Sequence, residues 1–130
     1  MGKSMKNENE AIIRDEELRW LLNAIQEVAK TGIRPDGLYW RASYTPEDAA
    51  AVALLKSYME QAGMRAFFDA VGNLHGVLQG KSEQVIMAGS HRDTVRSGGK
   101  YDGMLGILSA ICSAGRLYQR LGQPEKTLEV

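Results

Sequence analysis

Apolar side chains recur at helical spacing in the first quarter of the chain. They lie three and four positions apart, which places them on one face of a helix that we expect from about Asp15 to Lys30. The stripe consists of Leu18, Leu21, Leu22, Ile25 and Val28. Acidic residues precede it and Gly32 follows it, a pattern typical of a helix start and a helix end. Residues 1 to 13 show no such period, so we expect them to form a flexible polar tail.

Two further helices are predicted downstream. Thr45 can cap the first of them, Pro46 suits its opening position, and Gly63 marks its end. The second is expected from about Gly103 to Leu121. Its apolar residues occupy two rows, positions 104, 108, 111 and 118 and positions 107, 110, 114, 117 and 121, which predicts burial on two sides.

Short apolar runs between and after the helices predict strands. Met64–Val71 and Leu74–Leu78 flank the turn pair Gly72-Asn73. Gln84–Ser90 has the short apolar core expected of a strand that is covered on both faces, and a last strand is predicted from Thr127 to Val130. This alternation of helices and strands predicts an α/β fold. We expect a partial three-layer sandwich in which helices pack on a mixed or parallel sheet.

Composition and charge narrow the functional classes. A chain of 130 residues suggests one domain, and 16 basic residues against 16 acidic ones argue against nucleic-acid binding. The single cysteine, Cys112, excludes an internal disulfide framework and fits a reducing compartment. The first ten residues lack the apolar core of a signal peptide, and no apolar run approaches the ~18 residues of a membrane span. We therefore expect a cytoplasmic protein without nucleic-acid or membrane partners.

Candidate chemistry is concentrated between Gly89 and Gly106. His91 is expected at the carboxyl end of a buried strand, the edge at which open α/β sheets collect ligands. Asp102 lies just before the third helix, and a glycine-containing loop can fold back to bring its carboxylate to His91; imidazole and carboxylate suit zinc, manganese or cobalt. Asp93, two residues along an extended backbone, can accept the His91 N–H and fix its tautomer. The spacing alone also fits a structural histidine and a helix-capping aspartate.

The complete string resembles the M20 metallopeptidase superfamily, and within it the metal-dependent amidohydrolases of N-carbamoyl-L-amino acids, β-ureidopropionate and allantoate. Those enzymes carry G-S-H-x-D-T/S-V, a short spacer, and G-G-x-Y/F-D-G-x-x-G. Here the segments GSHRDTV (89–95) and GGKYDGMLG (98–106) match in order and spacing. YTPED (44–48), DAVGNL (69–74) and KTLEV (126–130) add further matches.

The resemblance implies roles for these residues. His91 would bind one metal ion, Asp102 would bridge two ions, and Asp93 would be the partner behind His91. The intact family enzyme would use two divalent ions, Zn²⁺ or else Mn²⁺ or Co²⁺, and would form a homodimer. Residues 14–130 would be the N-terminal part of the catalytic domain, without the lid or dimerisation domain. The family's general base would lie beyond Val130, so we expect the 130-residue chain alone to be inactive.

Several alternatives remain open from the sequence. Hydrolysis of N-carbamoyl-L-amino acids is favoured, with allantoate or β-ureidopropionate as alternative small-molecule substrates. The other candidates are a truncated product without activity, an interaction subunit, and a dipeptidase or aminoacylase of the wider superfamily. Arg92 departs from the family pattern, where an apolar residue is more common, and it is expected to point away from the metal. His75 is expected to be a solvated strand residue and Cys112 a buried, unreactive thiol.

Overall fold

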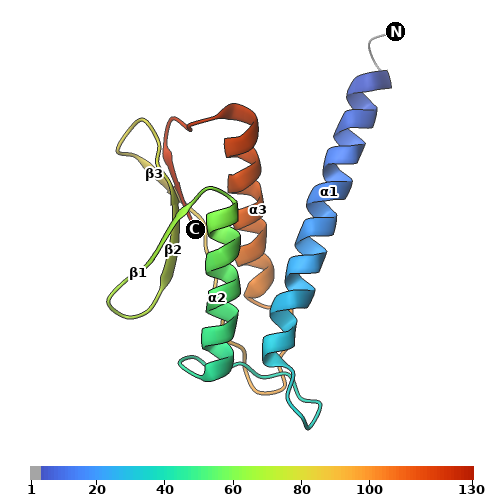
Figure 1. Ribbon diagram of the computed structural model, residues 1–130, viewed down its shortest axis with the longest axis vertical. Coiled ribbons are helices and arrows are strands. Elements are labelled where there is room, and N and C mark those ends of the chain that lie inside the picture. Colours follow the sequence, from blue (N-terminus) through green and yellow to red (C-terminus); the bar gives the residue numbers. More distant parts are fainter. Residues whose placement is uncertain (1–3) are drawn as a thin grey trace.

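The computed structural model describes the backbone of residues 4–130 and the side chains from residue 16 onward (Figure 1). Its helices are α1 (Ser4–Ala29), α2 (Pro46–Gln61) and α3 (Met104–Leu121), and a 3-10 turn, Lys30–Gly32, follows α1. Its strands are β1 (Arg65–Phe68), β2 (Leu74–Leu78), β3 (Val85–Met87) and β4 (Thr127–Glu129). Every helix and strand predicted from the sequence is therefore present, and most differ from the prediction only at their ends.

Helix α1 starts earlier than its apolar stripe predicts. It begins at Ser4 instead of Asp15, so residues 4 to 13, which we expected to form a flexible tail, belong to the helix. Residues 1 to 3 of that expected tail lie outside the described part of the chain. The physical reason is local. Residues 4 to 29 contain neither proline nor glycine, so no helix-breaking residue interrupts the backbone.

Helix α2 begins as its sequence predicts. The Thr45 hydroxyl oxygen accepts a hydrogen bond from the Asp48 backbone N–H at 3.3 Å, and Pro46 occupies the first helical position. This cap satisfies one of the N–H groups that a helix start leaves without an intrahelical partner. It also fixes where the Asp48 side chain emerges, a position that matters for the candidate site.

The four strands form one mixed sheet in the order β1-β2-β4-β3. Strands β1 and β2 are antiparallel, β2 and β4 are antiparallel, and β3 runs parallel to β4. Helices α2 and α3 lie on one face of this sheet, and α1 packs on the far side of them, mainly against α3 (Figure 1). The prediction of helices packed on a mixed sheet is confirmed.

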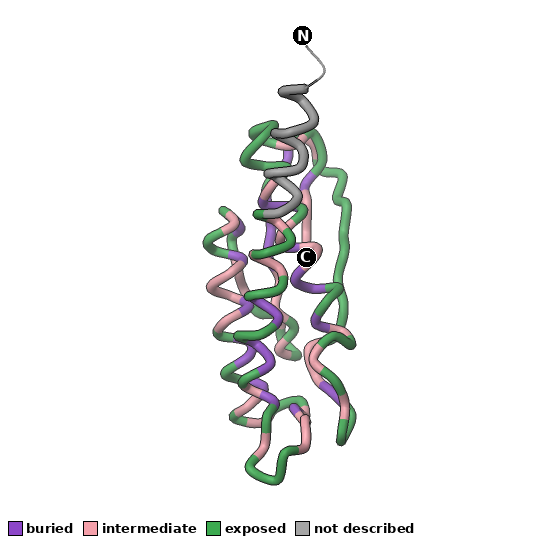
Figure 2. Tube along the Cα trace, turned by 90° about the vertical axis from the view of Figure 1, so that its right-hand side faces the viewer, coloured by how far each residue is buried: buried purple, intermediate pink, exposed green. Residues whose placement is uncertain are grey.

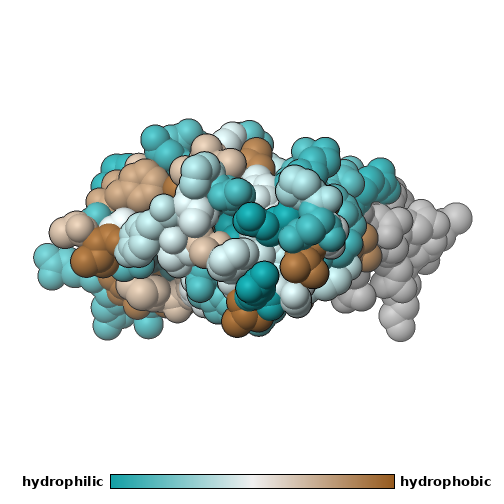
Figure 3. Space-filling model, turned by 90° about the horizontal axis from the view of Figure 1, so that it is seen from below, coloured by the Kyte–Doolittle hydropathy of each residue, from teal (hydrophilic) through white to brown (hydrophobic). Residues whose placement is uncertain are grey.

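The core lies between the helices and the covered face of the sheet. Buried positions gather where the helices face one another and the strands (Figure 2). Its largest fully buried apolar side chains come from all three helices: Ile25, Val28, Leu55, Met59, Met104, Leu108 and Ile111. Seen from the lower end, the surface is mainly polar, with apolar side chains in separate small patches (Figure 3). None of the helices among the described residues is long and apolar enough to cross a membrane.

One expectation about burial is wrong, and another holds for only part of its helix. Strand β3 is not covered on both faces, because it is the edge strand and pairs only with β4 among the described residues; its three side chains are 50 to 66% exposed. Helix α3 is buried in both predicted rows, but only as far as Gly115: Met104, Leu108 and Ile111 are buried in one row, and Ile107 and Ala114 in the other. Toward its end, Leu117 and Leu121 are 49% and 78% exposed.

Candidate functional site

The candidate site lies where the segment after β3 passes the start of α3. His91 belongs to this irregular segment and Asp102 stands two residues before the helix. Between Asp102 and the helix, Gly103 adopts a backbone φ of +73°, which side-chain-bearing residues rarely adopt. A Cβ at position 103 would collide with the His91 carbonyl oxygen and would lie 2.6 Å from the His91 Cε1 atom. Glycine is therefore what allows the start of α3 to approach His91.

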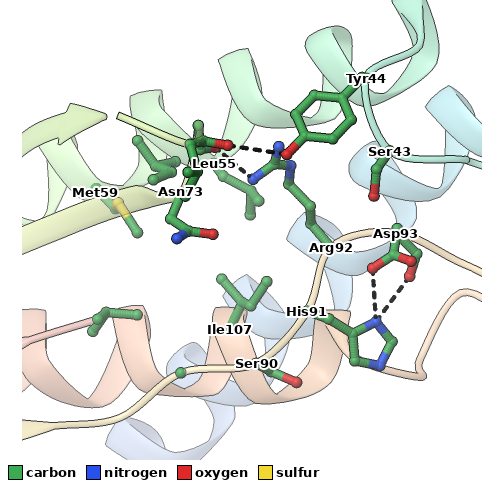
Figure 4. Close-up of a pocket in the computed structure, with 15 residues that line it drawn as sticks. Ser43, Tyr44, Leu55, Met59, Asn73, Ser90, His91, Arg92, Asp93 and Ile107 are labelled. Atoms are coloured by element: carbon green, nitrogen blue, oxygen red, sulfur yellow. Dashed lines mark hydrogen bonds and ion pairs between the residues drawn. The ribbon is translucent and has the colours of Figure 1, made fainter. Parts of the chain in front are cut away.

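The structure brings His91, Asp93 and Asp102 together. The His91 Nδ1 atom lies 2.9 Å from the Asp93 backbone oxygen and 3.4 Å from its carboxylate (Figure 4). The His91 Nε2 atom faces the Asp102 carboxylate at 3.7 Å. The sequence predicted this convergence, but it assigned the Nδ1 contact to the Asp93 carboxylate. The nearer partner is the backbone carbonyl.

These contacts favour one tautomer of His91. Both groups around Nδ1 are acceptors, so a neutral imidazole must carry its proton on Nδ1 to make a hydrogen bond there. The Nε2 lone pair then points toward the Asp102 carboxylate, and two acceptors face each other. Such a pair is satisfied by a proton on the imidazole or by a cation between the two atoms. Histidines that bind metals commonly donate from their other nitrogen to a carbonyl or carboxylate, and the Nδ1 contact of His91 has that geometry.

The donor set suits a divalent metal ion but is small. Nitrogen and oxygen donors bind zinc at about 2.0–2.2 Å, so one ion can reach both atoms of a pair 3.7 Å apart. Within the described part of the chain, no group of three histidine, cysteine or acidic residues is placed to hold a metal, because Asp93 sits behind His91. The side chains are also open to solvent, His91 at 50% and Asp102 at 77% exposure. The metal-binding roles remain predictions.

A cavity of about 200 Å³ adjoins this site. Its lining includes the buried apolar side chains of Leu55, Met59 and Ile107, together with the Asn73 amide and the Ser90 hydroxyl (Figure 4). His91 lies at the border of this cavity. A small molecule bound there would have one end beside the imidazole.

Arg92 points away from His91, as alternation along an extended segment predicts (Figure 4). Its guanidinium forms a two-pronged ion pair with the Asp48 carboxylate, with N···O distances of 2.7 and 3.2 Å, and it also donates to the Gly72 carbonyl oxygen at 3.0 Å. Asp48 accepts a further hydrogen bond from the Tyr44 backbone N–H. Burial raises the pKa of Asp48, but the hydrogen bonds from Arg92 and Tyr44 and the nearby positive charges outweigh it and hold the pKa below its usual value.

Arg41 is the residue that sequence reasoning missed most completely. Its side chain is 1% exposed, and its Nε and Nη2 atoms both donate to the Arg92 carbonyl oxygen, at 2.9 and 2.8 Å. Its Nη1 atom donates to the hydroxyls of Thr31 and Tyr39. A charged residue in a polar loop carries no sequence signal of burial. Asp48 had a signal, an acid in a first helical turn, but that signal did not indicate an ion pair with Arg92.

The second histidine is less solvated than predicted. His75 on β2 places its Nδ1 atom 2.7 Å from a Glu129 carboxylate oxygen and its Nε2 atom 3.5 Å from Asp69, and its ring stacks on Phe67. Its side chain is 26% exposed. Hydrogen bonding to Glu129 raises the pKa of His75. The Cys112 thiol is half-buried and its burial raises its pKa, which agrees with the expected unreactive thiol.

Comparison with known proteins identifies relatives of one kind. The chain is 42% identical over 107 residues to an allantoate amidohydrolase of Bacillus subtilis (strain 168), an alignment that covers 81% of this chain and 26% of that protein. It is 39% identical over 93 residues to an N-carbamoyl-L-amino acid amidohydrolase of Geobacillus stearothermophilus, covering 70% of this chain and 23% of that protein. No protein-family profile matches the chain.

Solved structures agree with the sequence relatives. A hydantoinase/carbamoylase family amidase from Burkholderia ambifaria superimposes with a TM-score of 0.79 at 30% identity, over 85% of this chain and 28% of that one. The chain thus spans about a quarter of the length of the proteins that it matches. Its fold and sequence both correspond to part of a larger protein of this kind.

Proposed function

The chain belongs to the amidohydrolase family that includes the allantoate and N-carbamoyl-L-amino acid amidohydrolases, and from this premise we propose that its residues 89–106 form part of a metal-dependent amide-hydrolysing site. One observation supports the proposal above all others. The His91 Nε2 atom and the Asp102 carboxylate face each other at 3.7 Å while the Nδ1 atom of the same ring is engaged by Asp93.

Each of the three residues has a separate task in this proposal. His91 and Asp102 would hold a divalent ion, Zn²⁺ or else Mn²⁺ or Co²⁺, through one nitrogen and one oxygen. An ion held by these two residues would supply Lewis-acid polarisation of the scissile carbonyl and a lowered pKa for the attacking water, which attacks after losing a proton. Asp93 would keep the His91 proton on Nδ1, so that Nε2 presents its lone pair. A carboxylate at Asp102 can serve two ions, because it has two oxygens.

The proposed substrate is an N-carbamoyl-L-amino acid, with allantoate or β-ureidopropionate as the alternative. These compounds share a ureido group whose C–N bond is cleaved, and each is small enough to lie partly in the adjoining cavity. Because the chain spans about a quarter of its relatives, further metal ligands and a group that handles the proton of the attacking water would come from other segments.

Zinc titration of the chain tests the metal site directly. Ring ¹H and ¹⁵N signals are followed as Zn²⁺ is added, and we expect those of His91 to respond. The substitutions His91→Ala and Asp102→Asn should abolish binding. His75→Ala is the matched control, because it removes the other histidine, which faces Glu129 and Asp69 instead. Zinc binding that survives His91→Ala but is lost in His75→Ala would contradict the proposal.

Hydrolytic activity is tested in a chimera. The part of this chain that aligns with the Bacillus subtilis relative replaces the corresponding segment of that protein, and release of ammonia is measured with allantoate and with N-carbamoyl-L-amino acids. We expect turnover that His91→Ala reduces to background. A folded chimera that binds metal but shows no hydrolysis of any ureido substrate would contradict the proposed activity. The substrate that is turned over fastest decides between the alternatives.

A further inference from the structure

His91 is held by very little packing. Its side chain is 50% exposed and that of Asp93 is 48% exposed, so neighbouring side chains do not confine either of them. The imidazole direction depends instead on one short contact, from Nδ1 to the Asp93 backbone oxygen at 2.9 Å. The orientation of the ring is therefore only as well fixed as the backbone that carries this oxygen.

That backbone is clamped on both sides of Asp93. On one side, the Arg92 carbonyl oxygen accepts two hydrogen bonds from Arg41. On the other side, the Thr94 N–H donates to the Arg41 carbonyl oxygen at 2.8 Å, and the Thr94 hydroxyl oxygen accepts from the Arg41 N–H at 2.8 Å. The peptide units that flank Asp93 are thus both tied to a single buried residue.

The Arg92 side chain adds a second tie, in a different direction. It reaches Asp48 at the first turn of α2 and the Gly72 carbonyl in the turn between β1 and β2. Asp48 is 4% exposed and Arg92 is 19% exposed, so solvent weakens this pair little compared with a surface ion pair. Paired oxygens and a planar guanidinium also fix the angle between the two groups, which a lysine could not do.

We propose that Arg92 is a positioning residue: its ion pair with Asp48, together with the hold of Arg41 on the Arg92 carbonyl, fixes the peptide that orients the His91 imidazole. The proposal rests on the proposed function, because it assigns the clamp to the metal-binding nitrogen of that site. It explains why an arginine is accommodated between His91 and Asp93. Its side chain points away from the proposed metal site and anchors the segment to Asp48 on α2.

The test measures the His91 ring and not activity. Ring ¹⁵N shifts of the full chain are recorded at pH 8 without metal, and Zn²⁺ is then titrated. In the unsubstituted chain we expect the Nδ1–H tautomer. In Arg92→Met we expect a mixture with the Nε2–H form, because the Asp93 carbonyl is no longer held against Nδ1. The zinc dissociation constant should rise about tenfold or more, the usual effect of losing the outer partner of a metal ligand. Asp48→Asn should have the same effect, and the double variant no greater one.

Two further variants separate positioning from general damage. Arg92→Lys retains the charge opposite Asp48 but cannot form the two-pronged pair, so it should shift the tautomer in the same direction as Arg92→Met. It provides the test if Arg92→Met does not fold. Arg96→Met is the matched control, because this arginine belongs to the same segment but lies over the Trp40 ring, 5.8 Å from its centroid. It should leave the His91 ring signals unchanged.

The outcomes distinguish this inference from the proposed function. If Zn²⁺ binds at His91 equally well in the unsubstituted chain and in folded Arg92→Met, with the same tautomer, the inference is wrong and the metal site stands. An equal response to Arg96→Met would also overturn it. If the tautomer depends on Arg92 but no Zn²⁺ binds at His91, the positioning role stands and the proposed metal site is wrong.

Discussion

Replacing Gly103 by alanine should destabilise the protein and separate Asp102 from His91. The native φ of +73° is strained for any residue with a Cβ, at a cost of roughly 1–3 kcal/mol. The new methyl group would also overlap the His91 carbonyl oxygen and would lie 2.7 Å from Nδ1, so the backbone of the site must shift. Bond-angle and peptide distortions of that kind add about 1 kcal/mol. The expected loss is therefore about 2–4 kcal/mol of unfolding free energy.

Urea unfolding followed by far-UV circular dichroism measures this loss. At an m-value of about 2 kcal/mol/M, the midpoint should fall by about 1–2 M. Gly99→Ala is the matched control in the same loop, because no atom lies within 4 Å of its added Cβ. Its midpoint should stay the same or rise slightly, since alanine restricts the unfolded chain. Equal midpoints for the two variants would show that Gly103 does not set the approach of α3 to His91.

The remaining predictions concern the core and the sheet. Leu108→Ala should lower the unfolding free energy by about 2–5 kcal/mol, because Leu108 is fully buried; a loss below about 1 kcal/mol would mean that the helices do not pack as described. The raised pKa of His75 stabilises the folded state below its unfolded pKa of about 6.5, and this contribution disappears as the pH rises through the folded value. His75→Gln should remove that part of the pH dependence of the urea midpoint, and an unchanged pH profile would refute the assigned contact with Glu129.

The sequence predicts the elements well where local signals decide them. The cap at Thr45 is a property of a few neighbouring residues, and the structure confirms it. The hairpin around Gly72-Asn73 also forms, but Phe68 pairs with Leu74, so residues 69–73 make the connection instead of a two-residue turn. Burial is predicted less well, because it depends on neighbours far away in the chain. The apolar run of β3 is typical of a covered strand, yet its place at the edge of the sheet leaves it exposed.

In the candidate site, too, the contacts that depend on local signals could be predicted and those between distant residues could not. The convergence of His91 with Asp102 could be predicted from the glycine-containing return loop, although His91 lies four residues beyond β3 and not at the end of a buried strand as expected. The hydrogen bonds from Arg41 to the Arg92 carbonyl oxygen could not be predicted. The two residues are about 50 positions apart in the chain, and arginines in loops are usually solvated. Asp48 illustrates the limit. Its position in a first helical turn predicts a favourable interaction with the helix dipole, and gives no sign that its main partner is Arg92.

The order of the strands has a consequence for how the protein folds. Strands β1 and β2 are neighbours in sequence and can form a hairpin as soon as both have been synthesised. Strand β3 cannot pair at that stage, because its partner β4 follows about 40 residues later in the chain, after the whole of α3. Until then its apolar side chains and its unpaired backbone are open to other strands. The slow step of folding should therefore be the insertion of β4 between β2 and β3, and partly folded chains should aggregate through β3.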